Sequence, residues 1–180
     1  SNTSVNGAAV DCVSATVTMT DVVVTESSNG YYGAGMCFDA CTATISGMAF
    51  EDNDVRYWIY HKNGGDLELS ESVFHSNTSP AASSAGGFIA VSNSDAEIRN
   101  NLAFENESDL TGGGAVNLSL SSGSVWMYNN TIANNEDVGS GSNSVIEAYY
   151  TGAVIENNII ANNSGYNMGI SSYYGATVEY

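Results

Sequence analysis

Two segments of equal length decide the fold: ATISGMAFEDN over residues 43–53 and LELSESVFHSN over residues 67–77. Both carry apolar residues at their first, third and eighth positions and asparagine at the last. Apolar residues at every second position are typical of a β-strand with one buried face, whereas an amphipathic helix spaces them by three or four. The two segments therefore predict a repeat of short strands that are separated by turns.

The same pattern runs through the whole chain at intervals of 24 to 29 residues. Its first position is occupied by Val17, Ala43, Leu67, Ala96, Val125 and Ala153. Ten residues further on, one serine is followed by five asparagines, at Ser27, Asn53, Asn77, Asn106, Asn135 and Asn163. Two more columns, seven and five residues before the first position, are also apolar; Tyr60 and Lys62 stand there in the third unit, and Lys62 is the one exception.

A unit of this length supplies one coil of a parallel β-helix, in which each strand stacks on the equivalent strand of the next coil at about 4.8 Å. Stacked asparagines tolerate the left-handed backbone of a corner, and their amides can hydrogen-bond to one another. We therefore predict an all-β fold, a parallel β-helix solenoid of six to seven coils that forms a single domain over residues 1–180.

Three short stretches carry a family resemblance. Gly113-Gly114-Ala115-Val116, Phe50-Glu51-Asp52-Asn53 and Phe74-His75-Ser76-Asn77 resemble the GGA-aliphatic and FxxN repeats of bacterial polymorphic outer-membrane proteins. More widely, nearly the whole chain resembles the right-handed parallel β-helix repeat proteins of the pectin-lyase-like superfold. The resemblance implies right-handed coils, in line with the general preference for right-handed crossovers. It also implies a secreted or cell-surface passenger domain, often an adhesin.

The two ends of the repeat have no evident polar cap, which solenoids need to prevent end-to-end strand pairing. We therefore expect a segment of a longer extracellular protein, whose ends a neighbouring domain or chain covers. The net charge of −17 argues against nucleic acids and anionic membranes as partners, because only Arg56, Lys62 and Arg99 are basic. Nucleic acids and anionic membranes both require clustered cations. No apolar run approaches the roughly 20 residues that direct membrane insertion needs.

The positions one and three residues after the first position of each unit should face solvent. There, Trp126 and Tyr128 stand beside Glu97 and Arg99 of the preceding unit and Glu156 of the following unit. Aromatic rings flanked by carboxylates and a guanidinium suit a sugar ring or a protein contact. We expect a non-catalytic binding or adhesion module for a cell-surface glycan or protein. A passive structural spacer, in which Trp126 binds nothing, is one alternative.

A carbohydrate-active enzyme, either a polysaccharide lyase or a hydrolase, or its degenerate relative, is the other alternative. The lyases that this fold resembles use Arg or Lys as a base, often beside calcium. Glycoside hydrolases need two carboxylates about 5 to 9 Å apart. The adjacent acids of this chain fall in predicted corners without a hydrolase signature, so we predict no catalytic residues and no enzyme activity. A second aromatic group, Tyr57, Trp58 and Tyr60 with His61, is either a functional insertion or a packed bulge.

The metal and sulfur chemistry is sparse. We expect no cofactor; calcium is the one ion that Glu51, Asp52 and Asp54 could bind as a group, and a solvated acidic turn is the alternative. Cys12 falls in an inward column, whereas Cys37 should point outward. A Cys37–Cys41 disulfide is within reach around the predicted corner, and three free thiols are the alternative. We place His61 and His75 on the surface.

Overall fold

The computed structural model describes residues 7–28, 34–82, 87–110, 116–119, 123–138, 144–149, 152–164, 167–173 and 177–179. The regular elements in these residues are all β-strands, and the strands pair in parallel. They form four sheets, which we call A to D in the order in which the chain reaches them. The predicted all-β parallel solenoid is confirmed.

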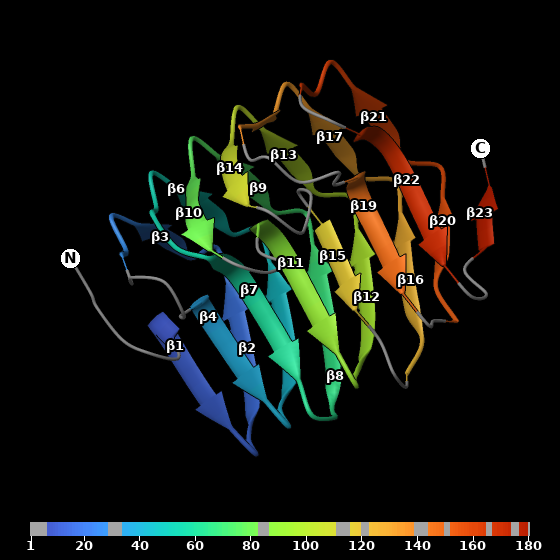
Figure 1. Cartoon of the computed structure of the whole chain (residues 1–180). Coiled ribbons are helices and arrows are strands. Elements are labelled where there is room, and N and C mark those ends of the chain that lie inside the picture. The colour runs from blue at the N-terminus through green and yellow to red at the C-terminus, as the bar shows by residue number, and fades with distance from the viewer. Residues whose placement is uncertain are drawn as a thin grey trace.

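Sheets A and B contain seven strands each. Sheet A consists of β1 (Gly7–Val13), β4 (Ala34–Asp39), β7 (Tyr57–Lys62), β11 (Gly87–Ser92), β15 (Val116–Ser119), β19 (Ser144–Tyr149) and β22 (Asn167–Tyr173). Sheet B consists of β2 (Thr16–Thr20), β5 (Thr42–Ser46), β8 (Asp66–Ser70), β12 (Asp95–Arg99), β16 (Val125–Tyr128), β20 (Val154–Glu156) and β23 (Thr177–Glu179). Figure 1 shows the strands of sheet A side by side, with β1 and β22 at its two ends.

Sheets C and D are built from shorter strands. Sheet C consists of β3 (Val23–Thr25), β6 (Ala49–Glu51), β9 (Val73–His75), β13 (Leu102–Phe104), β17 (Thr131–Ala133) and β21 (Ile159–Ala161). Sheet D consists of β10 (Thr78–Ala82), β14 (Glu107–Leu110) and β18 (Glu136–Asp137). Sheets A, B and C therefore form three faces of the coil, and sheet D closes part of a fourth.

The strand register stacks the predicted columns on one another. In sheet B, Ala43 pairs with Val17 and Leu67, and Ala96 pairs with Leu67 and Val125. In sheet C, the predicted eighth-position column pairs in unbroken order, with the residues Val24, Phe50, Phe74, Ala103, Ile132 and Ile160. Equivalent side chains of successive units therefore lie above one another, as the repeat predicts.

Aromatic side chains fill the middle of the core. The ring of Phe74 lies 4.2 Å from that of Phe88, 5.8 Å from Phe50 and 6.3 Å from Trp58, measured between centroids. All four side chains are fully buried. Because burial of one such side chain contributes about 1.5 to 3 kcal/mol, this cluster is a main source of stability for the second, third and fourth coils.

The corners repeat one backbone conformation. After the strands of sheets B and C, non-glycine residues adopt left-handed φ angles of 52° to 56°, at Asp21, Glu26, Asp52, Glu71, Ser76, Asn100, Glu105, Asn129, Asn134, Asn157 and Asn162. Asparagine and aspartate tolerate this region better than other side chains do. At such a corner the backbone N–H bonds the next coil; for example, Ser76 donates to the carbonyl of Glu105 at 3.1 Å.

The predicted asparagine ladder is confirmed. The backbone N–H of Asn53 donates to the side-chain oxygen of Asn77 at 3.0 Å, and that of Asn77 donates to Asn106 at 3.0 Å. The series continues from Asn106 to Asn135 at 3.1 Å and from Asn135 to Asn163 at 2.9 Å. Each side chain thus replaces a backbone acceptor at a corner where the sheet ladder is interrupted.

A second ladder lies at the corner between sheets B and C, and it was not predicted. Met48 donates its N–H to the hydroxyl of Ser72, and Ser72 donates to Asn101, with N···O distances of 3.1 and 3.0 Å. The ladder continues to Asn130 and Asn158. In the sequence this column begins with the apolar residues Val22 and Met48, which conceals its polar half.

Strand β7 lies one residue away from its predicted register. Ile59 pairs with Met36 of β4, and His61 pairs with Phe38 of β4 and Val91 of β11. The prediction that Tyr60 and Lys62 occupy the inward columns is therefore wrong. The cause is one extra residue in the next corner, where Gly64 and Gly65 adopt φ angles of +99° and +84°.

His61 is fully buried, which contradicts its predicted surface position. Burial lowers the pKa of His61, against smaller opposing effects of the Gly65 backbone and of the carboxylates of Asp66 and Asp95. The imidazole therefore stays neutral in the folded protein, because the charged form would have to be desolvated. Trp58 of the same strand is buried as well, so this part of the second aromatic group is packed into the core.

The disulfide joins Cys12 to Cys41, with a Cα–Cα distance of 6.6 Å, so the predicted Cys37–Cys41 pairing is wrong. Cys41 follows the left-handed corner at Ala40 and points inward, toward the first coil and its inward Cys12. Cys37 lies between the inward residues Met36 and Phe38, yet it is only 2 % exposed. Burial raises the pKa of this free thiol.

Candidate functional site

The residues predicted to form a binding face lie together on the outer side of sheet B. Glu97 of β12 pairs in register with Trp126 of β16, and Arg99 of β12 pairs with Tyr128 of β16. On the next strand, Glu156 pairs with Tyr128. Successive side chains of a strand point to opposite faces, so these five residues share the solvent side while Ile98 and Met127 between them are buried.

Hydrogen bonds connect three of these side chains with a fourth that was not predicted. Arg99 donates from Nε to Glu97 Oε1 at 3.0 Å and from Nη2 to Glu68 Oε1 at 2.5 Å. The hydroxyl of Tyr128 donates to the same oxygen of Glu97 at 2.5 Å. Glu68 was recognisable from the repeat, because it pairs in register with Glu97 one coil earlier.

This network fixes the charges at the site. The hydrogen bond to Glu68 is the main reason why the pKa of Arg99 is raised, and the hydrogen bond to Glu97 is the main reason why the pKa of Tyr128 is raised. Arg99 therefore stays a cation, but both of its ion pairs are with carboxylates of this face. Such pairs on the surface add little stability, about 0 to 1 kcal/mol each, so their main effect is to orient the carboxylates.

A groove of about 350 Å³ opens beside the network. Its walls come from the starts of β8, β12 and β16, with the residues Asp66, Leu67, Glu68, Asp95, Ala96, Glu97, Ser124 and Trp126. Trp126 is 56 % exposed, so much of its side chain is accessible to a ligand. Asp66, Asp95 and Ser124 were not predicted as site residues, although they share one repeat position directly before the first-position column.

The groove is strongly acidic. Four carboxylates line it, from Asp66, Glu68, Asp95 and Glu97, and Arg99 pairs with two of them. Asp95 also accepts a hydrogen bond from the backbone N–H of Ser124 at 2.6 Å. A ligand in this groove therefore meets hydrogen-bond acceptors and an aromatic face. Glu156 does not line the groove, although it is on the same face.

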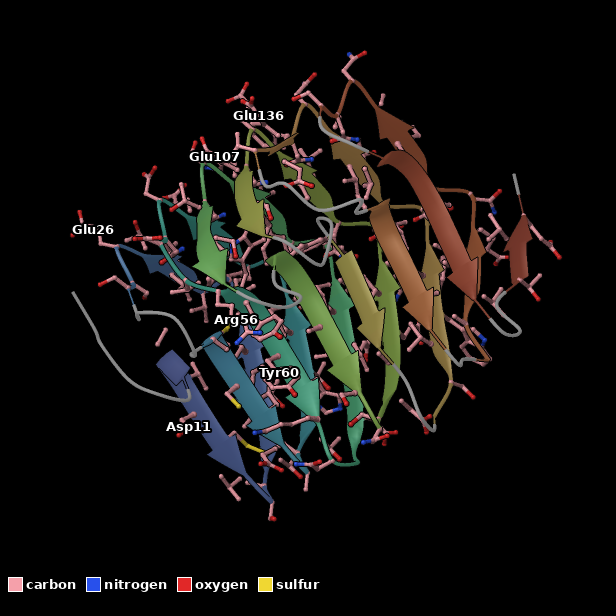
Figure 2. All side chains as sticks on the ribbon, viewed as in Figure 1. Asp11, Glu26, Arg56, Tyr60, Glu107 and Glu136 are labelled. Carbon is pink, nitrogen blue, oxygen red and sulfur yellow. A yellow bond between two sulfur atoms is a disulfide. The ribbon has the colours of Figure 1, made fainter. Side chains whose placement is uncertain are left out.

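Part of the second aromatic group lies on the outer face of sheet A. The rings of Tyr57 and Tyr60 stack with centroids 4.9 Å apart. Two of the three basic residues flank them, with Arg56 at 4.9 Å from the Tyr57 ring and Lys62 at 5.3 Å from the Tyr60 ring. Figure 2 labels Arg56 and Tyr60 on this face. Lys62 also pairs with Asp39 at 3.4 Å, so these side chains cover sheet A with contacts among themselves.

The three predicted calcium candidates do not share a site. Glu51 pairs with His75 at 2.7 Å, and Asp54 accepts a hydrogen bond from the hydroxyl of Thr78 at 3.0 Å. Asp52 is exposed at a left-handed corner between them. Within the described ranges, no three His, Cys, Asp or Glu side chains come together as metal ligands.

One arrangement superficially resembles a hydrolase relay. Glu51 contacts His75 Nε2, and His75 Nδ1 lies 3.2 Å from the hydroxyl of Ser76. Acyl transfer also requires N–H donors for the developing oxyanion. The N–H of Ser76 already donates to Glu105, and that of Asn77 donates to the side chain of Asn106. The N–H groups of Ser76 and Asn77 are therefore already engaged in hydrogen bonds between coils.

The comparisons with known proteins agree with the stacked coils. The family described as the right-handed β-helix region matches residues 6–180. No curated protein and no solved structure matches the chain significantly. In the described part of the chain, no helix is long and apolar enough to cross a membrane. The family match does not bear on the resemblance to polymorphic outer-membrane proteins, which stays a prediction. The match covers almost the entire sequence, and the chain therefore belongs to the right-handed β-helix family.

Proposed function

We propose that the chain is an extracellular, non-catalytic binding module that takes a neutral glycan in the groove on sheet B. The observation that carries the proposal is the exposed indole of Trp126, which stands at the wall of a groove lined by four carboxylates. Membership of the β-helix family is compatible with adhesins and with carbohydrate-active proteins alike. The site therefore has to decide between them.

The chemistry of the groove matches a sugar. The apolar CH face of a pyranose packs on an indole, and its hydroxyls donate to carboxylate oxygens. Glu68 and Glu97 offer such oxygens next to Trp126, and Arg99 holds both carboxylates in place. Since strands of a sheet are rigid, little ordering entropy is lost when the ligand binds.

The charge of the groove selects among sugars. Sialic acid, uronates and sulfated glycans carry negative charges, which the uncompensated carboxylates of Asp66 and Asp95 repel. Hydroxyl-rich neutral sugars have no such penalty. An extracellular location is supported by the disulfide between Cys12 and Cys41, because such bonds persist in oxidising compartments.

The test is a glycan array that carries matched neutral and acidic oligosaccharides, probed with the labelled protein. We expect neutral glycans to bind. Trp126→Ala should weaken the best of them by about tenfold or more, because it removes both the buried apolar area and the stacking contact, which contributes about 0.5 to 1.5 kcal/mol beyond that area. Thr44→Ala is the matched control, because Thr44 occupies the same outward row two coils before Glu97.

Four results would count against the proposal. Equal binding of Trp126→Ala and wild type would remove the groove as the site. Preference for acidic glycans would contradict its electrostatics. Release of shortened oligosaccharides during incubation would favour the carbohydrate-active enzyme, and an array without any signal would favour the spacer.

A further inference from the structure

The outer face of sheet C, which follows sheet B along each coil, carries a mostly apolar row of side chains. One outward position of each strand pairs with the same position of the next coil, and we call this row the sheet C stripe: Val23, Ala49, Val73, Leu102, Thr131 and Ile159. Val23 is 61 % exposed, Leu102 37 % and Ile159 60 %. Three large apolar side chains are thus open to solvent along a single line.

The second outward row of sheet C carries one carboxylate, and a histidine contacts it. In its middle, the carboxylate of Glu51 pairs with His75, and the imidazole stacks on the ring of Phe104 with centroids 5.3 Å apart. Ala133 and Ala161 continue this row toward the end of the rod. Together the two rows form a mostly apolar face in a chain that is otherwise strongly acidic.

One long edge of this face is lined by acids. Exposed carboxylates occupy the corner after sheet C and the start of sheet D, and we call them the acidic edge: Glu26, Asp52, Asp54, Glu105, Glu107 and Glu136. Figure 2 shows Glu26, Glu107 and Glu136 projecting from this rim. The corner on the opposite side of sheet C carries only Asp21 and Glu71 among the equivalent positions. The apolar face therefore has one strongly negative flank.

We propose that the sheet C stripe docks a basic amphipathic helix of a partner protein. Apolar side chains of the helix pack on Val23, Leu102 and Ile159, and its Lys or Arg side chains pair with the acidic edge. A second copy of this chain does not fit, because each copy carries a net charge of −17 and would bring another acidic edge to the interface. The charge complementarity therefore selects a cationic partner.

The dimensions agree with this occupant. Six strands at a spacing of about 4.8 Å give a stripe about 24 Å long, and a helix of about 16 residues has the same length at 1.5 Å per residue. A helix that lies along the rod presents one apolar residue per turn about every 5.4 Å, close to the spacing of the strands. This interaction uses a different face from the proposed glycan groove and does not depend on it.

The experiment uses a synthetic helical peptide of about 16 residues with a leucine face flanked by lysines, and a matched peptide in which glutamate replaces every lysine. Binding to the full chain is measured by fluorescence anisotropy at low and high salt. We expect the lysine peptide to bind and to lose affinity as salt rises, because salt screens the exposed charges. The glutamate peptide should not bind.

Two variants of the protein test the two halves of the interface. The triple variant Val23→Thr, Leu102→Thr and Ile159→Thr removes apolar surface but keeps residues that the stripe tolerates, since Thr131 already stands in it. Glu105→Gln with Glu107→Gln reduces the acidic edge without a change of shape. Each should weaken binding of the lysine peptide by about tenfold or more, whereas Trp126→Ala should leave it unchanged.

The proposal is overturned if the lysine peptide fails to bind, if the glutamate peptide binds equally well, or if Trp126→Ala abolishes binding while the stripe variants retain it. Circular dichroism confirms that each variant is folded. The charge variant keeps the test decisive even where the triple variant loses stability, because Glu105 and Glu107 are exposed.

Discussion

Replacement of Asn106 by alanine tests the asparagine ladder at its centre. The Asn106 side-chain oxygen accepts hydrogen bonds from the backbone N–H and the Nδ2 of Asn77, both at 3.0 Å. Its amide donates to the carbonyl of Phe74 at 3.0 Å and to the side-chain oxygen of Asn135 at 2.8 Å. Asn106→Ala removes all four hydrogen bonds from a side chain that is only 4 % exposed.

Most of the expected destabilisation comes from one backbone N–H group that loses its acceptor. The Nδ2 of Asn77 still reaches the carbonyl of Phe50, and Asn135 still accepts from the N–H of Asn106. The N–H of Asn77, however, is left buried without its acceptor, which costs about 1 to 3 kcal/mol. With the loss of the other bonds, we expect the free energy of unfolding to fall by about 2 to 4 kcal/mol.

Equilibrium unfolding in urea, followed by circular dichroism and tryptophan fluorescence, measures this value. Asn106→Ser is the informative comparison, because the hydroxyl of Ser72 accepts the N–H of Met48 at 3.1 Å in the other ladder. Serine should therefore restore the acceptor for the N–H of Asn77, and the free energy of unfolding of Asn106→Ser should fall by only about 1 to 2 kcal/mol. Glu107→Gln, at the exposed neighbouring position, controls for substitution in this coil.

Equal stabilities of Asn106→Ala and Asn106→Ser would refute the reasoning, because they would show that the buried acceptor has no energetic role. A loss below about 0.5 kcal/mol for alanine, within the range of ordinary surface substitutions, would do the same.

Three further predictions concern the core and the disulfide. Ile132→Asp places an unpaired charge at a fully buried position and should unfold the middle coils; a melting curve like that of the wild type would contradict the register. Because burial lowers the pKa of His61, the unfolded chain binds a proton at a higher pH than the folded protein does. The free energy of unfolding should therefore be unaffected by this group above about pH 6.5 and should fall below that pH by up to about 1.4 kcal/mol per unit, until the folded protein is protonated as well. In unfolding measured as a function of pH, His61→Phe should remove this slope and His75→Gln should keep it. Peptide mapping without reductant should find Cys12 linked to Cys41, and a linkage that includes the third cysteine would disprove this pairing. Because the two cysteines lie 29 residues apart, Cys12→Ser leaves the unfolded chain less constrained and should lower the free energy of unfolding by about 3 to 4 kcal/mol.

The columns of the repeat could be predicted because they depend on spacing alone. Side chains such as Phe50, Phe74 and Ile132 lie where the count of residues places them, and the same count places Trp126 above Glu97. One extra residue before Leu67 was enough to shift β7, because a slip by one residue exchanges the two faces of a strand. His61 and Tyr60 therefore exchanged their predicted environments.

Features that depend on three-dimensional neighbours were harder to foresee. The disulfide joins residues of different coils, and the short separation of Cys37 and Cys41 was a poor guide to it. The repeat places Glu68 in the same row as Glu97, but its hydrogen bond with Arg99, which draws it into the candidate site, is not revealed by spacing. The groove itself depends on how far side chains of three strands project, so its volume and the exposure of Trp126 could not be read from the repeat.

The bond between Cys12 and Cys41 gives the rod a preferred direction of unravelling. In a solenoid each coil is held chiefly by its neighbours, so terminal coils detach first under tension or heat. The sulfur bridge ties the first two coils into one cooperative block, and peeling from that side must release both at once. Under a stretching force, coils outside this block should therefore detach before the two crosslinked coils do.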